Sequence, residues 1–265
     1  MLIVVDVGNS NITLGLYDDQ RLCHCWRMET VATRTDDEYA LLLKLLLQEA
    51  GHPNSVVDGV IIASVVPALT RTMEKLTARL FGVAPLVVGP DLTTGMPVLY
   101  NSPKDVGADR IVNGVAAFAR FKAACIVVDF GTATTFDAIT ANGEYAGGAI
   151  APGISISMDA LFRRTAKLPR AEFTRPDQVI GRSTMESIQA GTYFGYVGLV
   201  DGVVRRMLTE LGARPEHVVA TGGLAPLIAR ETATIPEVDE TLTLEGLRLL
   251  YVLNVDARRA RRPAR

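Results

Sequence analysis

The sequence predicts an α/β protein built from two related lobes, each a mixed sheet with flanking helices. The strongest observation is a repeat, because residues 5–11 read VDVGNSN and residues 128–134 read VDFGTAT. Both segments end a β-branched run and precede another run with strand character, so both predict hairpins with polar, glycine-containing tips. The length of 265 residues lies near the size, roughly 250 to 300 residues, at which a single core stops growing. We therefore expect two lobes, residues 1–121 and residues 122–265.

The first half of the chain predicts a strand meander followed by a βαβ unit. Apolar side chains recur every three or four positions from Leu69 to Leu80, a spacing that predicts an amphipathic helix. The passage at residues 89–104 contains several glycines and prolines and predicts a loop. The expected strands are residues 2–5, 12–17, 22–28, 56–66 and 85–88, and the expected helices are residues 37–50, 69–81 and 109–121.

The second half repeats this order of elements. A hairpin over residues 125–139 leads to a third strand at residues 145–150, and helical segments follow. A further strand enters a Thr-Gly-Gly turn at residues 221–223, and the last helix is expected at residues 244–254. No linker of low complexity separates the halves, so the boundary near residue 122 predicts a hinge between packed lobes.

Composition and charge exclude several classes of protein. Hydrophobic residues make up 48% of the chain and charged residues 21%, which supplies buried cores and argues against extended disorder. The net charge of -2 gives no general attraction to nucleic acid or acidic membranes, so small molecules are the expected ligands. We find no signal-peptide pattern and no uncharged apolar run of about 18 residues. Three cysteines are too few for a disulfide framework, and we expect the cytoplasm.

The two hairpin tips have the residue types of a phosphate site. Glycine lets the backbone approach a ligand, and neighbouring amides and hydroxyls can donate to phosphate oxygens. Asp6 and Asp129 precede the tips and could hold a cation against those oxygens. The alternative is two ordinary hairpins whose aspartates favour turns, but a matched pair favours the phosphate interpretation. The chain lacks the P-loop and the dinucleotide fingerprint, so any nucleotide site is of another kind.

The order of the two hairpins and the turn at residues 221–223 resembles the actin, Hsp70 and sugar kinase superfamily. In that superfamily these segments form the two phosphate loops and the adenosine loop. The resemblance implies two actin-like, that is ribonuclease H-like, lobes with an ATP cleft between them.

Four longer blocks resemble the type III pantothenate kinases. They are residues 100–113, 129–137, 147–154 and 221–225. Ser10, Asp105 and Gly114 stand where the family more often has Thr, Glu and Ala, and none of these departures removes a group that the chemistry needs. The resemblance implies ATP-dependent phosphorylation of pantothenate to 4′-phosphopantothenate, the first step of coenzyme A biosynthesis, by a homodimer.

Asp109 is the pivotal residue of this resemblance, which implies that its carboxylate accepts the proton of the pantothenate hydroxyl. From the residues alone, an aspartate that opens the helix at residues 109–121 predicts an N-cap, whose pKa the helix dipole would lower. The two roles are compatible, because phosphoryl transfer has a loose transition state and needs positioning more than early deprotonation.

The resemblance also implies a set of substrate and nucleotide contacts. Arg110 has a fork of donors that suits a carboxylate, whereas the residues alone would favour a surface ion pair with Asp105. The implied pantothenate contacts are Tyr100, Gly107, Ala108, Arg110 and, from the partner subunit, Thr184. The implied ATP contacts are Asp6, Val7, Gly8, Asn9, Ser10, Asn11, Ile12, Thr13 and Thr132.

Two cations accompany this set. The resemblance implies a monovalent cation, potassium or ammonium, at Asp129, and magnesium with ATP at Asp6. Both are hard cations that take oxygen ligands, which carboxylates provide.

A predicted helix that starts near Ser183 has glycines on one face. Ser183 and Glu186 match a capping box. Further along, the glycines at positions 191, 195, 198 and 202 are spaced 4, 3 and 4 residues apart, which places them on one side of the helix. Each interior glycine costs roughly 1 kcal/mol relative to alanine, so we expect close helix packing on this face. The face, or its immediate surroundings, is the expected dimer contact.

Two further features predict structure rather than function. Cys23, His24 and Cys25 look like a zinc fragment, but four ligands are normally needed and no other His or Cys has matching spacing, so a strand is expected. Residues 258–265 contain five arginines, and a solvated C-terminus is expected there rather than a nucleic-acid site.

Two other functions stay open. The chain could be another kinase of the same superfamily, for sugars or acetate, or a nucleotide-dependent binding module such as the accessory regulators among these kinases' relatives. The complete Gly107-Ala108-Asp109-Arg110 sequence favours an enzyme.

Overall fold

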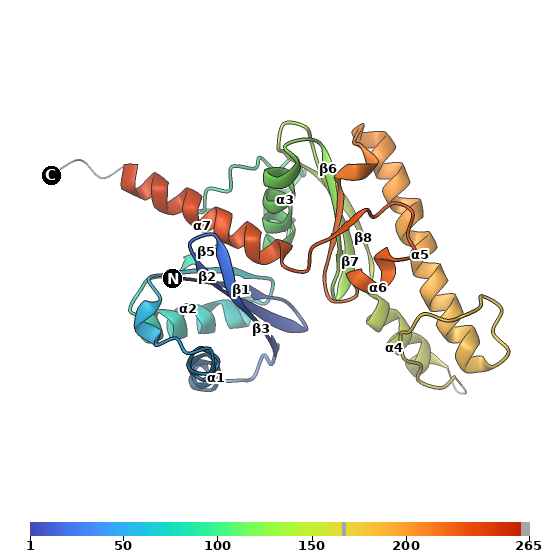
Figure 1. Cartoon of the computed structure of the whole chain (residues 1–265), viewed down its shortest axis with the longest axis horizontal. Helices are drawn as coiled ribbons and strands as arrows, with labels where there is room; N and C mark the ends of the chain where they lie inside the picture. The colour runs from blue at the N-terminus through green and yellow to red at the C-terminus, as the bar shows by residue number, and fades with distance from the viewer. Residues whose placement is uncertain (166–167, 261–265) are drawn as a thin grey trace. The chain divides into compact units, whose positions relative to one another are not determined.

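The computed structural model describes residues 1–165 and 168–260, which form two compact α/β units (Figure 1). The first unit comprises residues 1–96, residues 101–116 and helix α7 (Leu242–Ala260), and the second comprises residues 97–100 and 117–241. The chain passes from the first unit to the second after residue 116, close to the expected boundary at residue 122. The expected second lobe included the last helix, whereas α7 belongs to the first unit.

The first unit contains a five-stranded sheet in the order β3-β2-β1-β4-β5. The first three strands form an antiparallel meander, and β4 and β5 continue the sheet in parallel. The predicted meander and βαβ unit are thereby confirmed. The strands are β1 (Leu2–Val7), β2 (Asn11–Asp18), β3 (Arg21–Glu29), β4 (Gly59–Ser64) and β5 (Leu86–Val87), and the helices of this unit are α1 (Asp36–Glu49) and α2 (Pro67–Phe81). Helix α3 (Ala108–Phe121) begins in the first unit, and its residues from 117 onward belong to the second.

Alternate side chains of β1 pack with different helices on the two faces of this sheet. Ile3 and Val5 lie in a core with residues of α1 and α2, whereas Leu2 and Val4 lie in a second core with residues of α7. Successive side chains of a strand point to opposite faces, so a strand buried on both faces becomes apolar throughout. The sheet is therefore covered on both sides.

The second unit repeats this topology, with strands in the order β8-β7-β6-β9-β10. Its first three strands again form an antiparallel meander, and β9 and β10 continue in parallel. The predicted repeat is therefore a repeat of folding pattern as well as sequence. The elements are β6 (Cys125–Phe130), β7 (Ala133–Ile139), β8 (Tyr145–Pro152), α4 (Ile154–Arg164), α5 (Thr184–Leu211), β9 (Val218–Thr221), α6 (Ala225–Ala229) and β10 (Glu237–Val238).

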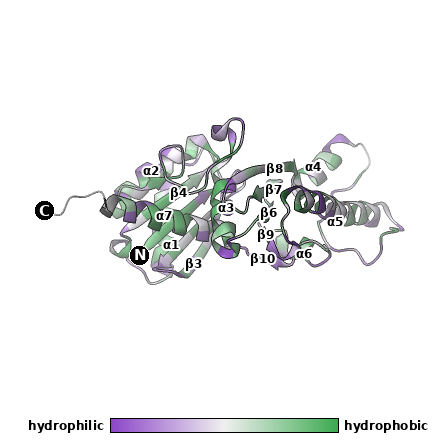
Figure 2. Ribbon diagram, turned by 90° about the horizontal axis from the view of Figure 1, so that it is seen from above, coloured by the Kyte–Doolittle hydropathy of each residue, from purple (hydrophilic) through white to green (hydrophobic). Residues whose placement is uncertain are grey.

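Helix α5 packs on one face of this second sheet. Val128 and Phe136 of the sheet share a core with Tyr193 and Val200 of α5. Figure 2 colours the longer helices partly hydrophobic and partly hydrophilic, as expected for helices with one buried face. None of the helices in the described ranges combines the length and apolarity needed to span a membrane.

Several boundaries differ from the expected ones. The strand expected at residues 56–66 is shorter, because a 3-10 turn (Asn54–Val56) precedes β4 and Pro67 starts α2 directly after it. The last helix extends well beyond the expected residues 244–254. The Cys-His-Cys segment lies in β3 as predicted. The arginine-rich tail, residues 258–265, lies outside the described side chains.

Candidate active site

The first hairpin tip lies between β1 and β2 and is held by hydrogen bonds. The Gly8 amide donates to the Asn11 carbonyl (3.0 Å), and a Cβ on Gly8 would lie only 3.0 Å from that oxygen. From the end of β3, Thr30 donates its hydroxyl to the Gly8 carbonyl (2.7 Å) and its amide to the Ser10 carbonyl (3.0 Å). The tip therefore has a defined backbone conformation before any ligand binds.

The predicted nucleotide residues of this hairpin divide into two groups. The side chains of Asn9, Ser10 and Asn11 are exposed at the tip, and Asp6 and Thr13 are half-buried partners on adjacent strands. Val7 and Ile12 are completely buried in the core of the first unit. Any ligand contact from these two residues must therefore come from their backbone groups.

The second hairpin tip lies between β6 and β7 and is shorter. The Gly131 amide donates to the Ala133 carbonyl (3.0 Å), and Thr132 stands between them. Gly153, at the start of α4, approaches this tip so closely that a Cβ would lie 2.0 Å from the Thr132 carbonyl oxygen. Position 153 therefore requires glycine, because any side chain there would overlap the Thr132 carbonyl.

Asp129, which precedes this tip, lies beside the Thr-Gly-Gly turn. Strands β6 and β9 pair in parallel with Asp129 opposite Thr221. Gly222 has a φ of +91°, and a Cβ there would lie 2.7 Å from the Asp129 Oδ1 atom and 2.7 Å from the Phe130 carbonyl oxygen. The structure thus brings the second hairpin and the predicted adenosine turn together within one unit.

Asp109 lies in the first turn of α3, and its expected role as an N-cap is wrong. The helix begins at Ala108, and the Asp109 Oδ1 atom accepts from the Arg110 amide (2.8 Å). Burial raises the pKa of the Asp109 carboxyl above its ordinary value, although that hydrogen bond and the Arg110 charge oppose the rise. The lowered pKa expected from the helix dipole is therefore wrong in direction.

Gly107 makes room for this carboxylate. A Cβ on Gly107 would lie 2.5 Å from the Asp109 Oδ1 atom and 3.7 Å from Val65 Cγ1. Val65 in turn donates its amide to the Val7 carbonyl at the end of β1 (3.0 Å). These contacts link Asp109 to the strand end that carries the first hairpin.

Arg110 and Tyr100 belong to different units. Arg110 is only 7% exposed, so the alternative interpretation as a surface arginine is wrong. Tyr100 is half-buried in the second unit, where its ring centroid lies 6.2 Å from that of Tyr145. Arg110 lies in the first unit with Gly107, Ala108 and Asp109.

Thr184 lines a cavity of about 650 Å³ between α4 and α5, together with Gly191, Gly195 and Tyr196. The predicted cap of α5 is present, because Ser183 Oγ accepts from the Glu186 amide (3.2 Å). The reciprocal half of the capping box differs, since the Glu186 carboxylate accepts from the Arg182 amide (2.7 Å).

The glycines of α5 have no close packing partner within the described chain, and two of them, Gly191 and Gly195, border the α4–α5 cavity. Added Cβ atoms at Gly191, Gly195 and Gly198 would meet no heavy atom within 4 Å, and at Gly202 only the end of Arg206. The close packing expected on this face is therefore not provided by the chain's own described residues.

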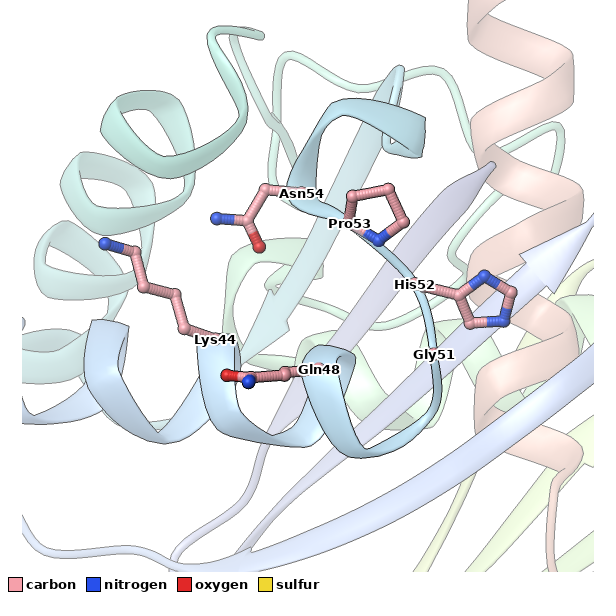
Figure 3. A pocket seen from close by; sticks show the side chains of 6 residues that line it. All are labelled: Lys44, Gln48, Gly51, His52, Pro53 and Asn54. Atoms are coloured by element: carbon pink, nitrogen blue, oxygen red, sulfur yellow. The ribbon is translucent and has the colours of Figure 1, made fainter.

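A second cavity, of about 420 Å³, contains none of the predicted site residues. Lys44 and Gln48 of α1 and residues 51–54 line it (Figure 3). Figure 3 shows the His52 ring on the opposite side from the Lys44 and Gln48 side chains.

Gly153 and Gly222 are not among the individually predicted site residues, although both lie in the blocks that carry the family resemblance. The sequence does indicate the conformation of Gly222, because a glycine after the end of a strand is typical of a left-handed turn. The requirement at Gly153 comes from its approach to Thr132, which lies far from it in sequence.

Comparison with known proteins gives a consistent result. A family model described as type III pantothenate kinase matches residues 2–206. Proteins named type III pantothenate kinase from Geotalea uraniireducens (strain Rf4) and Anaeromyxobacter sp. (strain K) are each 58% identical over 254 residues. Those alignments cover 96% of this chain and 99% and 100% of the relatives.

Solved structures support the fold at low sequence identity. An inorganic polyphosphate/ATP-glucomannokinase from Arthrobacter sp. strain KM has a TM-score of 0.50 and 16% identity, covering 95% of this chain and 98% of its own. The activator of 2-hydroxyisocaproyl-CoA dehydratase from Clostridium difficile has a TM-score of 0.52 and 10% identity, covering 100% and 99%. The predicted fold class of two actin-like lobes is confirmed.

Proposed function

Because this chain belongs to the type III pantothenate kinase family, we propose that it transfers the γ-phosphate of ATP to pantothenate. The product is 4′-phosphopantothenate, in the first step of coenzyme A biosynthesis, and the proposed location is the cytoplasm. The single observation that carries the proposal is the Asp109 carboxylate, for which Gly107 makes room and whose pKa is raised by burial.

Asp109 orients the primary hydroxyl of pantothenate and accepts its proton. A carboxylate with a raised pKa is a better proton acceptor than an ordinary surface aspartate. Since the transition state of phosphoryl transfer is loose, the proton can leave late, and the main task of Asp109 is to align the oxygen with the phosphorus. The carboxylate is fixed for this task by its hydrogen bond from the Arg110 amide.

Arg110, Tyr100, Gly107, Ala108 and Thr184 bind pantothenate in this proposal. The buried guanidinium of Arg110 suits the pantothenate carboxylate, because Arg donors in a dry environment bind carboxylates strongly. Thr184 lies at the start of α5, where it lines the α4–α5 cavity. In this proposal it contacts the substrate bound to the partner subunit.

The two hairpins bind ATP. The exposed tip residues Asn9, Ser10 and Asn11 and the second tip's Thr132 donate to phosphate oxygens, and the backbone of Asp6 to Thr13 borders the first tip. Such sites bind phosphate through many weak donors rather than one strong one.

Asp6 would hold magnesium and Asp129 a monovalent cation, potassium or ammonium. No group of three or more His, Cys, Asp or Glu side chains that could form a metal site occurs in the described part of the chain. That fits cations whose remaining ligands are ATP phosphates, backbone carbonyls and water, as is usual for magnesium bound with a nucleotide. The Phe130 carbonyl near the Asp129 carboxylate is such an oxygen. When bound, these cations neutralise phosphate charge.

The glycine face of α5 forms the contact of a homodimer. Glycines whose Cβ positions are open leave a smooth surface on which a second helix can pack closely. Sedimentation analysis at micromolar concentration should give a dimer, and a monomer under those conditions would contradict this part of the proposal.

The test of the function is ADP release from ATP with and without pantothenate. We expect release only when pantothenate is present, and none with a panel of sugars or acetate. Release with a sugar or acetate would identify a different kinase of this fold, and nucleotide binding without any transfer would identify a binding module.

A further inference from the structure

A buried pair of side chains in the second unit lies directly behind the predicted substrate residue Tyr100. Tyr145 is completely buried and donates its hydroxyl to the Asp137 Oδ1 atom over 2.7 Å. Asp137 is also completely buried, and its Oδ2 atom accepts from the Thr135 hydroxyl (3.3 Å). Burying a carboxylate is costly unless it is hydrogen-bonded, and an apolar pair of similar size would often be as stable.

The backbone of Tyr145 holds the segment that carries Tyr100. The Tyr145 amide donates to the Pro97 carbonyl (2.8 Å), and the Leu99 amide donates to the Tyr145 carbonyl (2.9 Å). Val98 thereby forms a parallel bridge with Tyr145 at the start of β8. The residues on either side of Tyr100 are exposed, with Leu99 at 53%. Backbone hydrogen bonds to Tyr145 therefore hold residues 97–99 to β8.

The side chain of Tyr100 rests on the same strand. Its ring lies 6.2 Å from the Tyr145 ring, tilted by 56°. Gly147, with a φ of +132°, lies under the ring, because a Cβ there would be 3.5 Å from Tyr100 Cε2. A side chain at position 147 would stand against the Tyr100 ring.

We propose that Asp137 and Tyr145 are positioning residues for Tyr100. Asp137 fixes the Tyr145 ring through its hydroxyl, and Tyr145 fixes Tyr100 through its ring and through the backbone of residues 97–99. The substrate in this inference, pantothenate, rests on the proposed function. The contacts among Asp137, Tyr145 and Tyr100 do not depend on it. The alternative is that the pair only stabilises the fold.

Tyr145→Phe is the decisive variant, since it removes the hydroxyl and keeps the ring and both backbone hydrogen bonds. Loss of one buried hydrogen bond should raise the KM for pantothenate by about tenfold. The KM for ATP and kcat should stay within about twofold of the unmodified enzyme, because in this proposal the hydroxyl acts on the position of Tyr100. Asp137→Asn retains an acceptor for the hydroxyl and should give a smaller rise.

Tyr193→Phe is the matched control. Tyr193 is also completely buried in the second unit, and its hydroxyl donates to the Leu227 carbonyl (2.9 Å). Tyr145→Phe should lower the melting temperature at least as much as Tyr193→Phe, because it removes a donor from a buried carboxylate rather than from a carbonyl. Only Tyr145→Phe should raise the KM for pantothenate. An unchanged KM in Tyr145→Phe, or an equal rise in both variants, would show that the pair is structural.

Two further measurements separate this inference from the proposed function. In a Tyr100→Ala background, Tyr145→Phe should raise the KM no further, and independent multiplication of the two effects would overturn the positioning role. In NMR spectra, the ring resonances of Tyr100, assigned with Tyr100→Phe, should shift in Tyr145→Phe and not in Tyr193→Phe. Unchanged resonances would refute the geometry even if pantothenate proved not to be the substrate.

Discussion

The two hairpin tips have similar sequences, yet different forces hold them in place. The first tip spans three residues between β1 and β2, and its carbonyls accept hydrogen bonds from Thr30. The second spans two residues between β6 and β7, and Gly153 and Gly222 pack tightly against it. A hydrogen bond contributes about 1 kcal/mol, whereas an overlap with backbone atoms forces the chain to move. A repeated motif therefore predicts a shared fold and not a shared response to mutation.

Neither tip contains Asp109, which lies in α3, between the two hairpins in the sequence. The comparison thus predicts that variants in the tips impair nucleotide binding and stability, whereas variants in the intervening segment impair transfer.

Asp109→Asn should lower turnover by about a thousandfold, because the amide cannot accept the hydroxyl proton. ATP affinity, measured by calorimetry, should stay within about twofold, since the change lies outside both tips. Turnover near that of the unmodified enzyme would contradict the assignment of Asp109 as the base.

The same variant has a stability consequence with a defined sign. Since burial raises the pKa of Asp109 in the folded protein, the folded state binds its proton more tightly than the unfolded state does. This group's contribution to stability therefore decreases as pH rises from the ordinary aspartate pKa through the raised one. Above that window Asp109→Asn should melt at a higher temperature than the unmodified protein, and below it the difference should vanish. Activity of the unmodified enzyme should fall as pH decreases through the raised pKa.

Gly153→Ala should destabilise the second unit by about 3 kcal/mol or more and abolish measurable ATP binding. The reason is the 2.0 Å separation between the added Cβ and the Thr132 carbonyl oxygen, which neither backbone can accommodate unchanged. Gly89→Ala is the control, since a Cβ at Gly89 would meet nothing within 4 Å. Equal melting temperatures for the two variants would show that the second tip is not held by steric fit.

Gly8→Ala should cost only about 1 kcal/mol and weaken ATP binding severalfold. The added Cβ would lie 3.0 Å from the Asn11 carbonyl oxygen, so a small adjustment of the tip suffices. The comparison of tips fails if Gly8→Ala is as damaging as Gly153→Ala in the same melting and calorimetry experiments.

Thr30→Val should have the smallest effect, about 1 kcal/mol or less. It removes the hydroxyl bond to the Gly8 carbonyl but keeps the amide bond to the Ser10 carbonyl. We expect a rise of about two- to fivefold in the KM for ATP, with no change in the KM for pantothenate. A larger rise in the KM for pantothenate than in the KM for ATP would contradict the assignment of this tip to ATP.

The sequence alone determined the features that depend on local pattern and on repetition. The β-branched runs and the duplicated Asp-x-Gly tips predicted both hairpins, the two related lobes and the order of elements along the chain that the two halves share. The blocks at residues 100–113 and 129–137 predicted the family. These inferences succeeded because strand and turn signals act over a few residues.

The tertiary structure decided the features that depend on contacts between distant residues. Helix α7 packs with Leu2 and Val4 of the first unit, although its amphipathic pattern says nothing about its partner. The requirement for Gly153, the raised pKa of Asp109 and the pairing of Asp137 with Tyr145 arise from distances and burial that no local pattern contains. Desolvation and steric overlap depend on what surrounds a residue in space, and that surrounding exists only once the chain has folded.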